Sequence, residues 1–220
     1  MTMQIAIDGP AGSGKSTVAR LVAERLGYLY LDTGAMYRAL TLKAMRKSIP
    51  LDDEEAIGEL LASTQIQLLP GKTTRVLLDG EDVSEEIRLP EVNRGVSAVA
   101  ALGKVRHGLV ALQRQLASTD VVMDGRDIGT VVLPRAQVKI FLVASIGERA
   151  RRRALELGER GIEVSQKQAE QELALRDQLD EGREVGPLVK APDAYILDTT
   201  ELSIEQVVER ILSLCEEKLA

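Results

Sequence analysis

The 220-residue sequence contains one cysteine, one histidine, one phenylalanine and no tryptophan. A single cysteine excludes an intramolecular disulfide and any cysteine-cluster metal site, and we expect Cys215 to be a buried thiol. Aromatic residues make up 2% of the chain, so it lacks the stacking platforms of proteins that bind single-stranded nucleic acids. His107 is expected to be an ordinary surface or packing residue.

Long apolar runs, a basic excess and a leader segment are also missing. No run approaches the roughly 18 apolar residues of a membrane span. The N-terminus has no basic flank, apolar region and cleavage site of a signal peptide, so we expect a cytoplasmic protein. The net charge of −6 argues against a partner such as a nucleic acid polymer, whose binding requires many phosphates to be neutralised.

Apolar periodicity indicates alternating strands and helices. Strands are predicted at 3–7, 28–31, 120–123, 138–143 and 194–197. Helices are predicted at 16–26, 35–46, 51–62, 90–101, 104–117, 165–179 and 203–218, and an arginine-dense helix start is predicted at 148–153. This alternation predicts an α/β fold with a parallel sheet. Two short runs at 65–69 and 75–78, with a Pro70-Gly71-Lys72 turn between them, predict an antiparallel hairpin that interrupts the alternation as an insertion at about 63–89.

A phosphate-binding loop follows the first predicted strand. The segment Gly9-Pro10-Ala11-Gly12-Ser13-Gly14-Lys15-Ser16 matches the P-loop pattern and lies between a strand and a helix. Its glycines let backbone N–H groups approach phosphate oxygens, and the helix that follows presents its positive end to the same anion. Lys15 is predicted to reach the β- and γ-phosphates of ATP, and the Ser16 hydroxyl to join the Mg²⁺ shell. The loop does not indicate which molecule accepts the phosphoryl group.

Polar clusters at the ends of predicted elements are candidates for the acceptor site. Asp32 and Arg38 follow the second strand, where Asp32 could orient the acceptor or hold Mg²⁺ through water and Arg38 could pair with a phosphate. A helix N-cap at Asp32 or Thr33 explains the first cluster equally well. The cluster Asp124-Gly125-Arg126-Asp127 follows another strand, and its charges favour contact with a ligand over a solvated turn.

A third cluster lies near the end of the 165–179 helix. Arg176, Asp180 and Arg183 recur at i, i+4 and i+7, which predicts one helical face that contacts the acceptor. An exposed ladder of salt bridges explains this spacing equally well. Ser97 and Arg106 lie within predicted helices and carry no signal of their own.

Together these segments resemble the bacterial cytidylate kinases over essentially the whole chain. The resemblance rests on four segments: 7–17, 31–38, 124–130, and Arg176-Asp177 with Asp180, Arg183 and Pro187-Leu188. It implies a three-layer P-loop NTPase fold with a central parallel sheet, an inserted acceptor-binding domain and a short lid. The implied boundaries are 1–31, 94–146 and 160–220 for the core, 32–93 for the acceptor-binding domain, and 147–159 for the lid.

The resemblance also implies the reaction and its residues. ATP with Mg²⁺ would phosphorylate CMP and dCMP, and the enzyme is expected to be a monomer with no membrane partner. Its catalytic residues would be Lys15, Arg126, Asp127 and Arg183. ATP phosphates would lie on Gly9 to Thr17, a segment that includes Gly12, Gly14 and Thr17, with Arg153 added from the lid. Cytosine and phosphate would be surrounded by Thr33, Tyr37, Ser97, Arg106, Arg126 and Asp127, the sugar by Arg176 and Asp180, and the α-phosphate by Arg38, Arg126 and Arg183. Asp32 completes the implied substrate site.

Cytosine selection has a simple physical basis at Asp127. Cytosine carries an N4 amino donor where uracil carries a carbonyl, so a carboxylate accepts from the first and repels the second. A buried polar group left unpaired costs about 1–3 kcal/mol, which corresponds to roughly tenfold to hundredfold discrimination.

The arginine-rich segment at 149–153 lies where related kinases have a mobile lid. Some of Arg149, Arg151, Arg152 and Arg153 are expected to close over ATP, although an exposed basic helix face is an alternative. Two other functions stay open. One is a related small-molecule kinase that acts on shikimate or AMP. The other is a nucleotide-hydrolysing switch, which is disfavoured because the guanine-reading Asn-Lys-x-Asp pattern is absent from the sequence.

Overall fold

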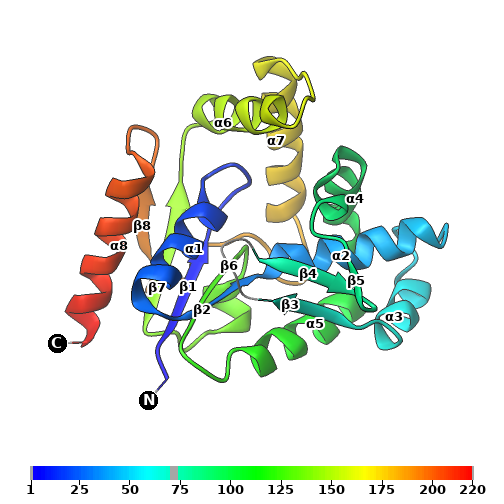
Figure 1. Ribbon diagram of the computed structural model, residues 1–220, viewed down its shortest axis with the longest axis horizontal. Coiled ribbons are helices and arrows are strands. Elements are labelled where there is room, and N and C mark those ends of the chain that lie inside the picture. Colours follow the sequence, from blue (N-terminus) through cyan, green and yellow to red (C-terminus); the bar gives the residue numbers. More distant parts are fainter. Residues whose placement is uncertain (1, 70–73, 220) are drawn as a thin grey trace.

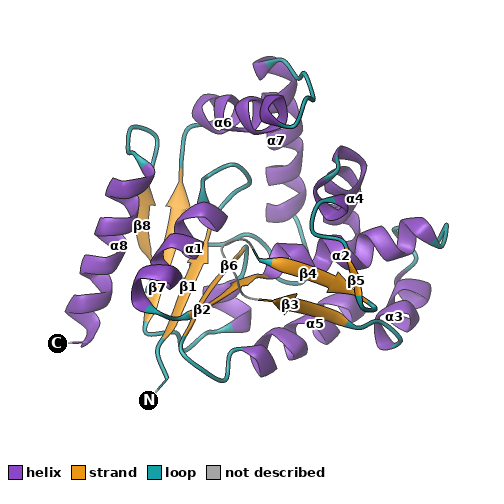
Figure 2. Ribbon diagram, viewed as in Figure 1, coloured by secondary structure: helices purple, strands orange, loops and turns teal. Residues whose placement is uncertain are grey.

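A five-stranded parallel sheet forms the centre of the computed structural model, which describes residues 2–69 and 74–219 (Figures 1 and 2). Its strand order is β2-β6-β1-β7-β8, and every neighbouring pair is parallel. The strands are β1 (Gln4–Asp8), β2 (Leu29–Asp32), β6 (Val121–Gly125), β7 (Val138–Val143) and β8 (Tyr195–Asp198). The predicted α/β fold with a parallel sheet is confirmed.

Helices cover both faces of this sheet, because successive side chains of a strand point to opposite faces. The helices are α1 (Lys15–Leu26), α2 (Thr33–Arg46), α3 (Glu54–Ala62), α4 (Pro90–Ala101), α5 (Gly103–Leu116), α6 (Ile146–Glu159), α7 (Gln166–Glu181) and α8 (Ile204–Leu219). Ile5 and Ile7 face a core formed with α1 and α8. Ala6, between them, belongs to a second core with Val110 of α5. The result is the expected three-layer arrangement.

The predicted insertion is a small antiparallel sheet beside a third apolar core. Strands β3 (Ile66–Leu69) and β4 (Arg75–Leu78) form the expected hairpin, and the expected turn at 70–72 lies outside the described residues. A third strand, β5 (Glu81–Asp82), pairs with β4 and was not predicted, because two residues are too short to show a period. Side chains of α2, α3, α4 and α5 pack with this sheet in one cluster.

Two helix predictions need correction, and two short helical turns were not predicted. Helix α3 begins at Glu54 and not at residue 51, because the Asp53 carboxylate caps it by accepting from the Ala56 N–H at 3.0 Å. Helix α7 ends at Glu181, so Arg183 lies beyond it and shares no helical face with Arg176. A π-helical turn at Ile128–Val132 and a 3₁₀ turn at Glu86–Arg88 were also not predicted.

The register of the sheet positions the polar strand ends. Asp124 lies beside Ile7 on one side and Asp32 on the other, so the ends of β1, β2 and β6 meet at one edge, as ligand sites in open α/β sheets require. Within the described residues no single helix has the length and apolar composition of a membrane span. Only α4 and α5 taken together, as a pair bent by 96°, pass that test.

Candidate functional site

A cleft of about 710 Å³ lies at this edge of the sheet. It is bounded by the P-loop, the start of α2, the end of β6, and helices α6 and α7, which lie above the sheet in Figure 1. The predicted site residues that line it are Ala11, Gly12, Ser13, Gly14, Lys15, Ser16, Thr17, Asp32, Thr33, Tyr37, Arg38, Arg106, Arg126, Asp127, Arg153, Arg176, Asp180 and Arg183. Gly9, Pro10 and Ser97 do not line the cleft, but Pro10 and Ser97 are hydrogen-bonded to Lys15 and Asp180, which do.

The P-loop has the shape of an anion cradle. Gly9 has a φ of +149°, and a Cβ there would lie 2.1 Å from the carbonyl oxygen of Leu142, so only glycine fits. Gly14, with φ +88°, turns the chain into α1. The Lys15 Nζ donates to the Pro10 carbonyl at 2.7 Å, which folds the lysine back across the loop. Burial, and then the nearby Arg126, lower the pKa of Lys15, because both disfavour the charged form of its amino group.

Asp124 connects the start of α1, just after the P-loop, to β2. Its carboxylate accepts from the Ser16 hydroxyl at 2.7 Å and from the Tyr30 hydroxyl at 2.9 Å. Burial, and then the charge of Asp32, raise its pKa to about 6. Hydroxyl and carboxylate oxygens suit Mg²⁺, which takes few protein ligands and keeps water and phosphate oxygens for the rest. Asp124 was singled out only as part of its cluster, and its contact with Ser16 was not predicted.

The N-cap interpretation of the Asp32 cluster is confirmed, and contact of Asp32 and Arg38 with an acceptor or Mg²⁺ stays a prediction. Asp32 caps α2, because its Oδ1 accepts from the Ala35 N–H at 2.9 Å. Its Oδ2 accepts from Arg38 at 2.8 Å. The neighbouring Thr33 donates its hydroxyl proton to the Asp124 carbonyl at 2.7 Å. The carboxylate therefore fixes the direction of Arg38, which lines the cleft.

Arg106 and Asp127 form a buried ion pair deep in the cleft. Arg106 is 2% exposed, and its guanidinium donates to the Asp127 carboxylate and to the Ala100 carbonyl. The Tyr37 ring lies beside the same guanidinium, 5.7 Å from its carbon. Burial raises the pKa of Asp127, and Arg106 opposes that rise. The solvated-turn interpretation of residues 124–127 is therefore wrong.

Asp180 is the hub of the second charged cluster. It is 1% exposed and accepts from Arg126 Nε at 2.7 Å, from Arg183, and from the Ser97 hydroxyl at 3.4 Å. The interpretation as an exposed salt-bridge ladder is therefore wrong. Arg176 lies close by with a buried Nε that has no hydrogen-bond partner among the described residues. Burial, and then Arg126, lower the pKa of Arg176 to about 9, so this cluster holds more positive charge than its carboxylates balance.

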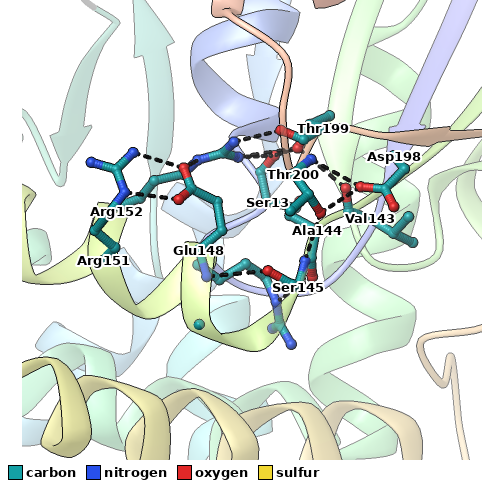
Figure 3. Close-up of polar contacts among 12 residues, drawn as sticks. Ser13, Val143, Ala144, Ser145, Glu148, Arg151, Arg152, Asp198, Thr199 and Thr200 are labelled. Carbon is teal, nitrogen blue, oxygen red and sulfur yellow. Dashed lines mark hydrogen bonds and ion pairs between the residues drawn. The ribbon is translucent and has the colours of Figure 1, made fainter.

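The arginines of α6 differ in their surroundings. Figure 3 shows Arg152 bound to Thr199 and Glu148. The Thr199 hydroxyl in turn lies 3.3 Å from the Ser13 carbonyl. Arg151 is 54% exposed in its side chain, as the basic-face alternative predicts. Arg149 is buried and does not line the cleft.

Sequence reasoning also missed Asp8, at the end of β1. Its two carboxylate oxygens accept from the N–H groups of Ile128 and Gly129, each at 2.8 Å. These bonds tie the segment after Asp127 to the strand that leads into the P-loop. Burial raises the pKa of Asp8 to about 6 despite both bonds.

Comparisons with known proteins show the family of the chain. The family model described as cytidylate kinase matches residues 5–217. The chain belongs to the cytidylate kinase family. It is 55% identical over 218 residues to the cytidylate kinase of Desulfitobacterium hafniense, covering 99% of this chain and 94% of that one. It is 54% identical over 219 residues to that of Lysinibacillus sphaericus, covering 99% and 98%.

Similarity to solved structures concerns the fold alone. A crystal structure of an uncharacterized protein from Eubacterium ventriosum has a TM-score of 0.53 to this chain at 13% identity, with 99% of each chain covered.

Proposed function

We propose that this member of the cytidylate kinase family transfers the γ-phosphoryl group of ATP to CMP and dCMP, giving CDP and dCDP. The observation that carries the proposal is a single cleft that joins a P-loop to the buried pair Arg106–Asp127 and the Asp180 hub. One end suits a nucleoside triphosphate, and the other suits a base with a phosphate. The alternative acceptors, shikimate and AMP, are disfavoured by the family to which the chain belongs.

The donor end uses backbone and cation together. The P-loop N–H groups and the start of α1 face the triphosphate, and Lys15 would leave the Pro10 carbonyl to bind the β- and γ-phosphates. Mg²⁺, held by Ser16 and Asp124, would neutralise charge on the phosphate oxygens. Arg153, which now pairs with Glu156 at 2.9 Å, is our candidate for a lid contact with ATP.

The acceptor end recognises two different groups. Asp127 would accept from the cytosine N4 amino group, supported by Arg106, Tyr37, Thr33 and Ser97. The α-phosphate would lie against Arg38, Arg126 and Arg183, and the sugar against Arg176 and Asp180. Because Asp180 already holds Arg126 and Arg183, their guanidinium groups are oriented before the phosphate arrives.

Transfer then depends on position and charge. The cationic cluster stabilises the charge that spreads over the transferred group, and water is kept out when the lid closes. A nucleotide phosphate is already ionised near neutral pH, so no strong general base is required. Asp127 would act through recognition, because its carboxylate is occupied by Arg106.

We also propose a division of labour along the chain. Residues 32–93 would bind the acceptor nucleoside monophosphate, residues 147–159 would form the lid, and residues 1–31, 94–146 and 160–220 would form the core. The protein would act as a cytoplasmic monomer on free nucleotides.

The test is a coupled assay of ADP release from Mg·ATP, with CMP, dCMP, UMP, AMP and shikimate supplied separately. We expect release that strongly favours CMP and dCMP over the other three and over a reaction without acceptor. Release that does not depend on the acceptor would refute the proposal and support a nucleotide-hydrolysing switch.

A further inference from the structure

Arg149 connects three parts of the chain beneath the P-loop. Its Nη1 donates to the Ala11 carbonyl of the loop at 3.2 Å and to the Asp177 carboxylate of α7 at 2.5 Å. Its Nε donates to the Ala144 carbonyl, just after β7, at 3.1 Å. The side chain is 9% exposed and that of Asp177 is 15% exposed. The Arg149 guanidinium is therefore bound by three acceptors within the protein and does not line the cleft.

The backbone of the P-loop is shaped around the same residue. A Cβ at Gly12 would lie 3.1 Å from the Cβ of Arg149 and 3.2 Å from its carbonyl oxygen, so the loop rests directly on the first turn of α6. Apolar packing here is limited, because three of the four buried residues in the cluster of Ala11, Ala150, Ala169 and Leu173 are alanines, with Ile146 and Val164 partly buried against them. Small side chains bury little area and therefore contribute little hydrophobic free energy. Polar contacts therefore contribute to the attachment of the P-loop to α6 and α7.

The neighbour of Asp177 on α7 is Arg176, which faces the cleft. Arg176 lies near Arg126, Arg38 and Arg153, all of the same charge, and near Asp180, which offsets their repulsion in part. Arg176 also acts electrostatically on Lys15. Mutual repulsion would push α7 away from the P-loop when no phosphate is bound. The ion pair Arg149–Asp177 opposes that separation.

We propose that Arg149 and Asp177 form a strut that fixes the distance between the P-loop and the arginines of α7. The pair touches neither nucleotide and acts as a positioning pair for the proposed CMP kinase reaction, on which this inference rests. Since a displacement of about 1 Å can cost a hundredfold in rate, loss of the strut should lower kcat more than it raises either KM.

The experiment compares Arg149→Met, Asp177→Leu and the double variant with the wild type. Each single variant should lower kcat by about 10- to 100-fold, with the KM values for ATP and CMP changed by less than about threefold. The double variant should be no slower than the worse single one, because both changes remove the same contact. The kcat of Asp177→Asn should lie between those of the wild type and Asp177→Leu, because the amide oxygen can still accept from Arg149. This variant also keeps the test possible if Asp177→Leu fails to fold.

A matched control removes a comparable ion pair outside the cleft. Lys139 and Asp193 are joined at 2.9 Å, with side chains 7% and 63% exposed, and neither lines the cleft. Asp193→Asn should leave kcat unchanged. Additive effects of the two strut variants on kcat would overturn the proposal, as would a lower melting temperature with unchanged kcat.

A second measurement does not depend on the acceptor. Hydrogen exchange of the ligand-free protein should become faster in both the 9–14 and 166–181 segments when the strut is removed, and remain unchanged there in Asp193→Asn. If wild-type protein fails to phosphorylate CMP but shows this pattern, the proposed function fails and the strut stands. Exchange that is unaltered in the P-loop would refute the strut even in an active kinase.

Discussion

Replacing Asp180 with asparagine tests whether this buried carboxylate orients the acceptor site. Asp180 accepts from Arg126 and Arg183, and is 1% exposed. Burial alone would raise its pKa, but Arg126 and Arg183 hold it below the ordinary value, so the group is ionised at neutral pH. An asparagine has one acceptor oxygen and would turn its amino group toward the other guanidinium.

The magnitude follows from the bond that is lost. A hydrogen bond to a charged group contributes about 1.5–3 kcal/mol, so Asp180→Asn should lower kcat/KM for CMP by roughly 10- to 150-fold. The KM for ATP should change by less than about threefold, because Asp180 does not contact the P-loop. Stability should also fall, since two buried arginines lose their shared counter-charge.

Steady-state kinetics with each substrate varied in turn separates these effects. Glu181→Gln is the matched control, because it removes a carboxylate from the next, exposed position and should leave both parameters unchanged. If Asp180→Asn lowers the melting temperature but leaves kcat/KM for CMP intact, the carboxylate serves stability alone and our reasoning is wrong. An equal loss toward ATP and CMP would also contradict it.

Two further carboxylates give sharp predictions. Asp127→Asn should reduce the preference for CMP over UMP by about 10- to 100-fold, measured as the ratio of the two kcat/KM values, and an unchanged ratio would exclude Asp127 as the selector. Asp124→Asn should raise the Mg²⁺ concentration for half-maximal rate by about 10- to 100-fold, which a Mg²⁺ titration at fixed ATP would show. Because the pKa of Asp124 is about 6, wild-type kcat/KM for ATP should fall as the pH drops through that value. Because folding raises this pKa, Asp124 contributes stability that is fully present below its unfolded-state pKa of 3.8. That contribution is lost as the pH rises through about 6. Asp124→Asn should therefore increase the free energy of unfolding at pH 8 by up to about 3 kcal/mol and have little effect at pH 4, and no gain at pH 8 would refute this assignment.

Local motifs made much of the fold predictable. The P-loop needs eight consecutive residues between a strand and a helix, so one short segment is enough to predict its geometry. The sheet followed from apolar alternation, and the hairpin from two short runs around a turn. The parallel order β2-β6-β1 could not be read in this way, because strand neighbours depend on crossover connections far apart in the chain. The contact of Ser16 with Asp124 depends on that order and was missed.

The surroundings of individual side chains were the other feature that could not be predicted from the sequence. Periodicity grouped Arg183 with Arg176, but the chain leaves the helix at Glu181 and Arg183 reaches Asp180 from a loop. The π-helical turn at 128–132 has no sequence signal. It forms where the Asp8 carboxylate takes the first two N–H groups of the segment, and that contact joins residues 120 positions apart. A basic run at 149–153 likewise did not reveal that Arg149 is buried and Arg151 exposed.

The cleft and the rest of the molecule carry opposite charge. Ten lysine and arginine side chains and seven carboxylates line the cleft, whereas the whole chain has a net charge of −6, so the remaining surface is more acidic than that total. Field lines from a low-dielectric cleft are focused outward, which raises the local concentration of small anions at its mouth and can speed their capture by about 10- to 1000-fold. Mononucleotides that fit the opening are drawn in, whereas the acidic excess of the rest of the molecule disfavours long polyanions. Association rates should therefore decline as ionic strength increases, while the bound complexes, sheltered from mobile ions, are much less affected.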